Sequence, residues 1–217
     1  MNATPVPVVS VQSVGSDAVA LELRSPEGFD ARPGQFVKLS ATVDGEDVSR
    51  FYTISSPHIT ETFETTLTID PTGTFGPYLS ELESGDTIGV AGPFGDAYYE
   101  DEAQTLIVAG GPGVGPAVGI AERTLMDSGE TAIVYVDEDP IHEQRLSALS
   151  EQGATVFVVS DSDALPSAIE EATDGTEPQP FVYGFADFLE VATDALGAAG
   201  VDTDTAKTEN FGPAPDA

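Results

Sequence analysis

Residues 50–56, RFYTISS, combine side chains that can bind a phosphate and a flat ring on one strand. The guanidinium of Arg50 offers a planar pair of donors to phosphate oxygens. Tyr52 follows two residues later, so on a strand its ring shares a face with Arg50 and can stack on a ring system. Thr53 adds a hydroxyl beside them. On its own, the segment is equally compatible with a surface strand that carries one salt bridge.

Three glycine-rich segments follow. Residues 73–79 (GTFGPYL) form a turn that opens a short helix predicted at 77–82, and backbone N–H groups at a helix start bind phosphate. Residues 92–95 (GPFG) close the first half of the chain, shortly after Gly85-Asp86. Residues 110–116 (GGPGVGP) come directly after an apolar strand, with Pro116 in the place of the third glycine of a dinucleotide fingerprint. Proline suits the first position of a helix, because its missing N–H has no helical partner there.

The spacing of apolar residues indicates which elements position these segments. The first half has short β-branched runs separated by turn residues, which predicts a six-stranded antiparallel Greek-key barrel. Its predicted strands are 6–11, 18–24, 35–41, 48–54, 63–69 and 87–91.

The second half alternates continuous apolar strands with helices, which predicts a doubly wound parallel sheet with helices on both faces. Its predicted strands are 105–109, 132–136, 154–159 and 181–183, and its predicted helices are 116–127, 144–150, 165–172 and 185–197. We therefore expect two domains, 1–99 and 100–217.

The order and spacing of these motifs resemble the ferredoxin–NADP reductase superfamily across residues 5–212. The resemblance implies an FAD-binding barrel (an FR-type domain) followed by an NAD(P)-binding α/β domain. It implies that Arg50 holds the FAD pyrophosphate, that Tyr52 stacks on the isoalloxazine and that Thr53 lies near flavin N5. Thr68 and Ile69 match positions that border FAD.

The same resemblance assigns the glycine-rich turns and the end of the chain. The residues that would cap the pyrophosphate are Gly73, Thr74, Phe75 and Gly76. Those that would receive the nicotinamide dinucleotide are Gly111, Gly113 and Pro116. Glu209 and Phe211 resemble the terminal acidic and aromatic pair, with Glu209 facing the reacting rings, so Thr53 and Glu209 are the expected catalytic residues.

Three positions depart from the family pattern. Gly76 replaces a serine, which removes one side-chain bond to phosphate, and Pro112 replaces a threonine in the nicotinamide turn. Tyr183 replaces a cysteine that packs near the reacting nicotinamide carbon. Because tyrosine is larger, its effect on nicotinamide entry is left open by the sequence.

The resemblance implies an FAD-dependent oxidoreductase that passes electrons between NAD(P)H and a separate one-electron carrier, such as ferredoxin or another redox protein. Acidic residues 137–139 and 161–163 follow the second and third parallel strands, and carboxylates bind ribose hydroxyls, which favours NADH over NADPH. The alternatives are a flavin-binding electron-transfer subunit of a larger redox complex and a non-catalytic module that has lost flavin.

The amino-acid composition restricts which partners, cellular locations and metal sites are compatible with the chain. The 217 residues contain 38 Asp+Glu and 7 Lys+Arg, a net charge of −31, which disfavours nucleic acid and anionic membranes as partners. A hydrophobic fraction of 40% is enough for a core, so we expect the acidic residues to lie on the surface. Such an acidic surface suggests a halophilic, haloarchaeal-type protein rather than an acidic mesophilic one. There is no cysteine and no apparent secretory signal, so we expect a cytoplasmic protein without thiolate metal sites. With only His58 and His142 in separate halves, we also expect no histidine metal site or Ser–His–Asp triad.

Overall fold

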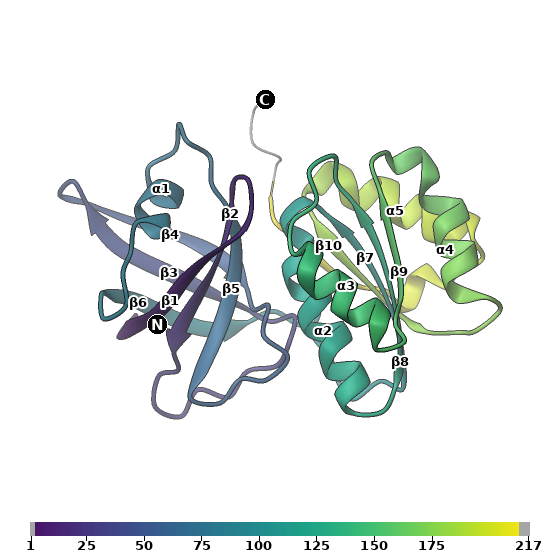
Figure 1. The fold of residues 1–217 in the computed structure, drawn as a ribbon, viewed down its shortest axis with the longest axis horizontal. Helices are drawn as coiled ribbons and strands as arrows, with labels where there is room; N and C mark the ends of the chain where they lie inside the picture. Colours follow the sequence, from purple (N-terminus) through teal and green to yellow (C-terminus); the bar gives the residue numbers. More distant parts are fainter. Residues whose placement is uncertain (1–2, 213–217) are drawn as a thin grey trace.

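A computed structural model describes residues 3–212, so residues 1, 2 and 213–217, at the outer ends of the two expected domains, lie outside the described residues. Figure 1 shows an antiparallel β-structure from the first half of the chain beside an α/β layer structure from the second half. No described helix is long and apolar enough to cross a membrane.

The first half is a six-stranded antiparallel sheet in the order β4-β3-β6-β1-β2-β5, which confirms the predicted barrel. The sheet closes where Ile54, just after β4, bridges Thr65 of β5, and where the Ser55 N–H donates to the Glu64 carbonyl at 2.8 Å. The strands are β1 (Thr4–Gly15), β2 (Ala18–Arg24), β3 (Phe36–Val43), β4 (Glu46–Thr53), β5 (Thr62–Thr68) and β6 (Thr87–Phe94).

Alternating side chains fill this barrel. Leu21 and Leu23 of β2 and Val37 and Leu39 of β3 are completely buried in one apolar cluster, as the two-residue period of a strand requires. The short helix α1 (Phe75–Ser80) is anchored to the same cluster by Phe75 and Leu79. The glycine-rich turn before α1 is therefore held at a fixed place against the barrel.

The second half is a five-stranded parallel sheet in the order β11-β10-β7-β8-β9. Its strands are β7 (Gln104–Gly110), β8 (Glu130–Val136), β9 (Thr155–Val159), β10 (Gln179–Gly184) and β11 (Lys207–Asn210). Its helices are α2 (Val114–Met126), α3 (Glu143–Glu151), α4 (Leu165–Thr173) and α5 (Ala186–Ala198).

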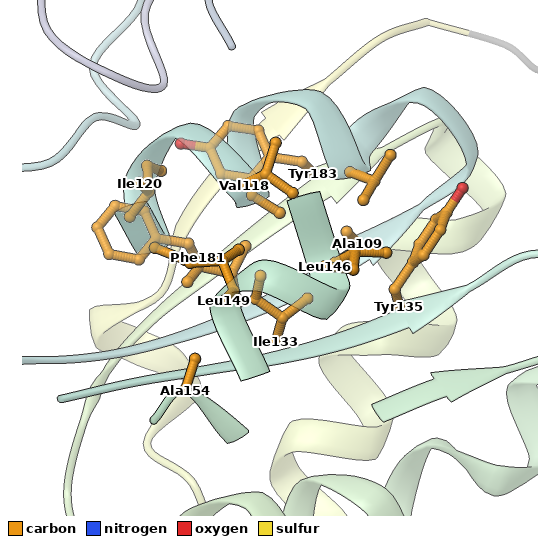
Figure 2. Packing of buried hydrophobic residues seen from close by; sticks show 14 of the residues in the cluster. Ala109, Val118, Ile120, Ile133, Tyr135, Leu146, Leu149, Ala154, Phe181 and Tyr183 are labelled. Atoms are coloured by element: carbon orange, nitrogen blue, oxygen red, sulfur yellow. The ribbon is translucent and has the colours of Figure 1, made fainter. Parts of the chain in front are cut away.

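Both faces of the parallel sheet are covered, as the continuous apolar strands predicted. Ile107 and Ile133 belong to the cluster that contains the buried side chains of α2 and α3. Figure 2 shows Leu146 and Leu149 of α3 packed against this face of the sheet. Leu106 and Val134 point to the opposite face, into a second cluster with α4 and α5.

Three local features differ from what the sequence predicted, one by omission and two in their bounds. β11 was not predicted as a strand, because its sequence KTEN has no apolar pattern and its extended form depends on parallel pairing with β10. A 3₁₀ turn (Gly111–Gly113) leads directly into α2, which makes Pro116 the third helical residue instead of the first. Its missing N–H is still tolerated, because the first four N–H groups of a helix have no helical acceptor. β1 also continues to Gly15, so that the hairpin turn is confined to residues 16–17.

Candidate functional site

A cleft of about 320 Å³ lies between the barrel and the parallel sheet. Barrel residues form most of its wall, and three residues from the second half complete it. The lining residues are Arg50, Phe51, Tyr52, Thr53, Thr66, Leu67, Thr68, Asp70, Gly73, Thr74, Phe75, Gly76, Pro112, Phe185 and Phe211. The volume is within the range of small-molecule and cofactor sites.

The contribution of the second half comes from one edge of its sheet. Pro112 follows the carboxyl end of β7, Phe185 follows β10 and Phe211 follows β11. In open parallel sheets, ligands bind in the crevice at the carboxyl ends of the strands. The cleft therefore has the location that this topology favours for a ligand.

A larger depression of about 1220 Å³ lies at the opposite edge of the same sheet. Gln104, Glu130 and Gln179, which line it, are at the amino ends of β7, β8 and β10. It is lined by several carboxylates, without a described cation on its wall. We therefore place the functional site in the smaller cleft.

Arg50 is exposed at this cleft and has no carboxylate partner within the 4.0 Å limit of a salt bridge among residues 3–212. The only described hydrogen bond of its side chain goes from Nη1 to the Ser49 carbonyl at 2.8 Å. Of the seven Lys and Arg side chains, Lys38 is the other without such a pair. The paired ones are Arg24, Arg32, Arg123, Arg145 and Lys207. The guanidinium of Arg50 is thus available to an anionic ligand in a strongly acidic protein.

Tyr52 and Thr53 continue the wall from Arg50. The ring centroid of Tyr52 lies 6.4 Å from that of Phe75, so the turn before α1 and strand β4 meet at this point. Burial raises the pKa of Tyr52 to about 12, although the nearby charge of Arg50 opposes the shift, and the phenol is neutral at physiological pH. Thr53 is buried, with a relative exposure of 7%.

The glycine-rich turn supplies backbone donors rather than charge. Asp70 accepts bonds from the Thr72 N–H at 2.8 Å and the Thr72 hydroxyl at 2.7 Å, which lower the pKa of Asp70 and fix the turn. The Gly73 N–H donates to the Asp70 carbonyl at 3.0 Å. The first N–H groups of α1 have no helical acceptors and lie beside the cleft that Arg50 lines. A free guanidinium, unpaired helix N–H groups and an aromatic wall together fit a pyrophosphate joined to a flat ring.

Of the residues expected from the sequence, nine meet in this cleft. They are Arg50, Tyr52, Thr53, Thr68, Gly73, Thr74, Phe75, Gly76 and Phe211. Five others do not line it. Ile69 packs into the barrel cluster, Gly113 and Pro116 are buried at the start of α2, and Gly111 borders the neighbouring turn with a φ of 53°. The fifth is Glu209.

Glu209 is half-buried near the end of β11, on the strand that leads to Phe211. Its carboxylate lies beside Gly95, since a Cβ built on that glycine would be 3.3 Å from Glu209 Oε2. Burial, and then repulsion from Asp96, raise the pKa of Glu209 to about 7. The carboxyl group can therefore hold or release a proton near neutral pH.

Tyr183 does not line the cleft. Its side chain is completely buried between the two halves, and its hydroxyl donates to the Ala97 carbonyl at 2.5 Å. Figure 2 shows its ring within the cluster that also contains Phe181. The increase in size from cysteine to tyrosine is thus absorbed by packing against the barrel.

Some lining residues were not expected as binding residues from the sequence. Phe51, Thr66 and Leu67 are neighbours of predicted positions on β4 and β5. Phe185 follows the Tyr183-Gly184 pair, and its ring meets Phe211 edge-on at 6.1 Å between centroids. A position directly after the carboxyl end of a parallel strand was the available signal for Phe185.

Comparison with known proteins agrees with this geometry. Residues 5–99 match the family model described as oxidoreductase FAD-binding domain. This match covers the barrel half of the chain, which is therefore similar to the FAD-binding domain of oxidoreductases. The matched residues include all six barrel strands except Thr4, the first residue of β1, and the cleft lies where this barrel meets the parallel sheet.

Beyond the FAD-binding domain, similarity extends over most of the chain. The chain is 26% identical over 211 residues to the glycine betaine monooxygenase reductase subunit of Pseudomonas aeruginosa, covering 86% of this chain and 58% of that protein. The chain is also 26% identical over 152 residues to the toluate 1,2-dioxygenase electron transfer component of Pseudomonas putida, covering 66% of this chain and 45% of that protein. The chain thus spans 58% of the length of the first relative and 45% of the length of the second.

The fold is shared with a solved structure, the flavohem-like FAD/NAD-binding domain of nitric oxide dioxygenase from Vibrio cholerae. The TM-score is 0.81 at 21% identity, covering 98% of this chain and all of that one.

Proposed function

We propose that this protein is an FAD-dependent oxidoreductase that transfers electrons between NAD(P)H and a one-electron carrier such as ferredoxin. The observation that carries the proposal is the cleft itself. It combines the wall of an FAD-binding domain, including the unpaired Arg50, with the carboxyl edge of a parallel sheet.

Bound FAD supplies the redox chemistry, accepting a hydride and releasing electrons singly, so the protein has to position the rings and exclude water. Arg50 and the first N–H groups of α1, including that of Gly76, would bind the pyrophosphate in this proposal, and the turn at Gly73 would lie against it. Tyr52 would stack on the flavin ring, and Thr53 would lie near its reacting edge, since both residues line the cleft. The neutral phenol of Tyr52 favours this stacking, because it brings no charge against the ring.

The second half binds the nicotinamide dinucleotide in this proposal. The turn that contains Gly111 and Pro112 follows β7, and Phe185 and Phe211 form an apolar wall opposite the barrel. Glu209, with its raised pKa, is a proton-holding group near this edge. The Vibrio cholerae domain, which is described as binding FAD and NAD, supports this arrangement.

The choice between NADH and NADPH has less support than the sequence suggested. Asp137 accepts a bond from the Tyr135 hydroxyl at 2.8 Å, and Asp139 accepts one from the Ser16 hydroxyl of the barrel. These two carboxylates therefore have structural partners, which leaves exposed Glu138 as the free acid of the group. NADH remains our preference, since no described arginine or lysine lies in this loop to bind a 2′-phosphate.

An exposed aromatic cluster beside the cleft supports a protein as the electron acceptor. Phe51 is 60% exposed, and its ring centroid lies 5.5 Å from that of Phe36 and 6.2 Å from that of Phe94. A chain of net charge −31 is poorly suited to dock an acidic partner by charge. We propose an apolar contact at this cluster, in a cytoplasmic, haloarchaeal-type setting where high salt screens the repulsion.

A second candidate is a flavin-binding component of a larger redox complex, which the names of the relatives, a reductase subunit and an electron transfer component, favour. The two are separated by loading the protein with FAD at high salt, removing free FAD, and mixing it without oxygen with NADH or NADPH. Bleaching by either nucleotide supports the free reductase. Retained flavin that neither nucleotide bleaches supports the component of a complex, and failure to retain FAD contradicts both.

A further inference from the structure

A buried hydrogen bond connects the second half of the chain to the wall of the cleft. His142 Nε2 lies 2.7 Å from the hydroxyl of Thr66 on β5. His142 is 4% exposed and Thr66 is 5% exposed, so water does not compete for this bond. Thr66 also lines the cleft, whereas His142 stands behind it.

The position of His142 is fixed by both halves. It adopts a left-handed conformation, with φ of 57° and ψ of 25°, immediately before α3. Its backbone N–H donates to the carbonyl of Val14 on β1 at 2.8 Å. A non-glycine residue is costly in this conformation and persists where its surroundings hold it. The imidazole is thus presented to Thr66 with little freedom.

The ring is neutral. Burial, reinforced by the nearby charge of Arg145, lowers the pKa of His142 to about 3. A neutral imidazole makes one defined bond to a hydroxyl, as donor or acceptor, and places no charge behind the cleft.

Packing around Thr66 determines which of its two side-chain groups, the hydroxyl or the methyl, faces the cleft. A Cβ built on Gly115 of α2 would be 2.7 Å from Thr66 Cβ and 2.9 Å from its Oγ1, so α2 lies directly against the hydroxyl side. With the hydroxyl directed at α2 and His142, the methyl group is the part of the side chain left for the cleft. Rotation about χ1 would reverse the two groups.

We infer that His142 is a positioning residue that holds the hydroxyl of Thr66 away from the cleft, so that an apolar methyl group faces the bound ring. The inference rests on the proposed function for the identity of the ligand as FAD. Without the imidazole, the Thr66 hydroxyl is free to turn into the cleft and place a polar group against the ring.

The test is a cycle of variants of the full chain in which the dissociation constant of FAD and its visible absorption bands are measured. His142→Asn keeps a residue that tolerates the left-handed conformation but shortens its reach, and Thr66→Val keeps the shape while removing the hydroxyl. We expect His142→Asn to weaken FAD binding about tenfold and to shift the flavin bands. In the Thr66→Val background the same change should alter affinity less than about twofold, because valine has no hydroxyl to turn.

Equal weakening by His142→Asn in both backgrounds would overturn the inference, since it would make His142 a purely structural residue. Unchanged affinity in the wild-type background would overturn it as well. If His142→Asn does not fold, His142→Gln takes its place in the cycle. A wild-type protein that does not bind FAD would instead refute the proposed function, and the inference with it.

Discussion

The Nη1 atom of Arg145, on α3, lies 2.9 Å from the Glu64 carboxylate on β5, so an ion pair joins the α/β half to the barrel. The same guanidinium binds both carboxylate oxygens of Glu122 on α2 at 2.8 Å and donates to the Ser55 carbonyl at 2.8 Å. Ser55 stands two residues after Thr53, the last residue of β4. One arginine thus fixes two helices against the strands that form the cleft.

Replacing Arg145 by alanine should lower the free energy of unfolding by about 3 kcal/mol, because two largely buried carboxylates lose their partner. Urea unfolding at constant high salt measures the effect. The matched control is Arg24→Ala, which breaks a pair whose side chains are 53% and 87% exposed and should cost less than about 1 kcal/mol. Equal losses in the two variants would contradict a structural role for the Arg145 cluster.

Replacing Arg50 by alanine should weaken FAD binding by about 10- to 100-fold, the loss expected for a charge-assisted bond to phosphate. Fluorescence titration of the apoprotein with FAD measures it. Lys38→Ala is the control, because Lys38 also has no described carboxylate partner but does not line the cleft. If the two variants bind FAD alike, Arg50 does not hold the pyrophosphate.

Gly76→Ser should strengthen FAD binding by about two- to tenfold, because it adds a hydroxyl beside the backbone donors of the turn. The site accepts the larger residue, since a Cβ at Gly76 would meet its nearest neighbour at 3.5 Å. Gly76→Ala separates the hydroxyl from the gain in helix propensity. A serine variant that binds no better than the alanine variant would count against phosphate at this turn.

Glu209 should make stability depend on pH. Its pKa is about 7 in the folded protein against 4.5 ordinarily, so between these values the folded state holds a proton that the unfolded state has released. The contribution of Glu209 to stability is therefore present below pH 4.5 and is lost as the pH rises through 7. Glu209→Gln should lose less stability between pH 5 and pH 8 than the wild type in urea unfolding, whereas Glu46→Gln, at an exposed carboxylate, should follow the wild type. Parallel curves for wild type and Glu209→Gln would show that this carboxyl group is not perturbed.

The sequence predicted those parts of the fold that local patterns determine. Alternation along β4 placed Arg50 and Tyr52 on one face, and the continuous apolar strands predicted a sheet covered on both sides. β11 was missed because its extended form depends on its neighbour β10 rather than on its own side chains.

The candidate site was predictable only where its residues are close together in the chain. The cluster from Arg50 to Thr53 and the turn from Gly73 to Gly76 are of this kind. Phe185 and the bond between His142 and Thr66 depend on how the two halves pack, and 76 residues separate the last pair. The spacing of residues within either half does not predict which residues of the two halves come into contact.

The most direct test of the central claim is the electron stoichiometry of the FAD-loaded protein. NADH carries two electrons, so the proposed reductase should reduce about two equivalents of a one-electron acceptor, such as ferricyanide, for each NADH consumed. The reaction, followed without oxygen at high salt, should require bound FAD, so its rate in Arg50→Ala should fall in proportion to the FAD that the variant loses. A protein that retains FAD yet reduces no acceptor with either NADH or NADPH would contradict the account.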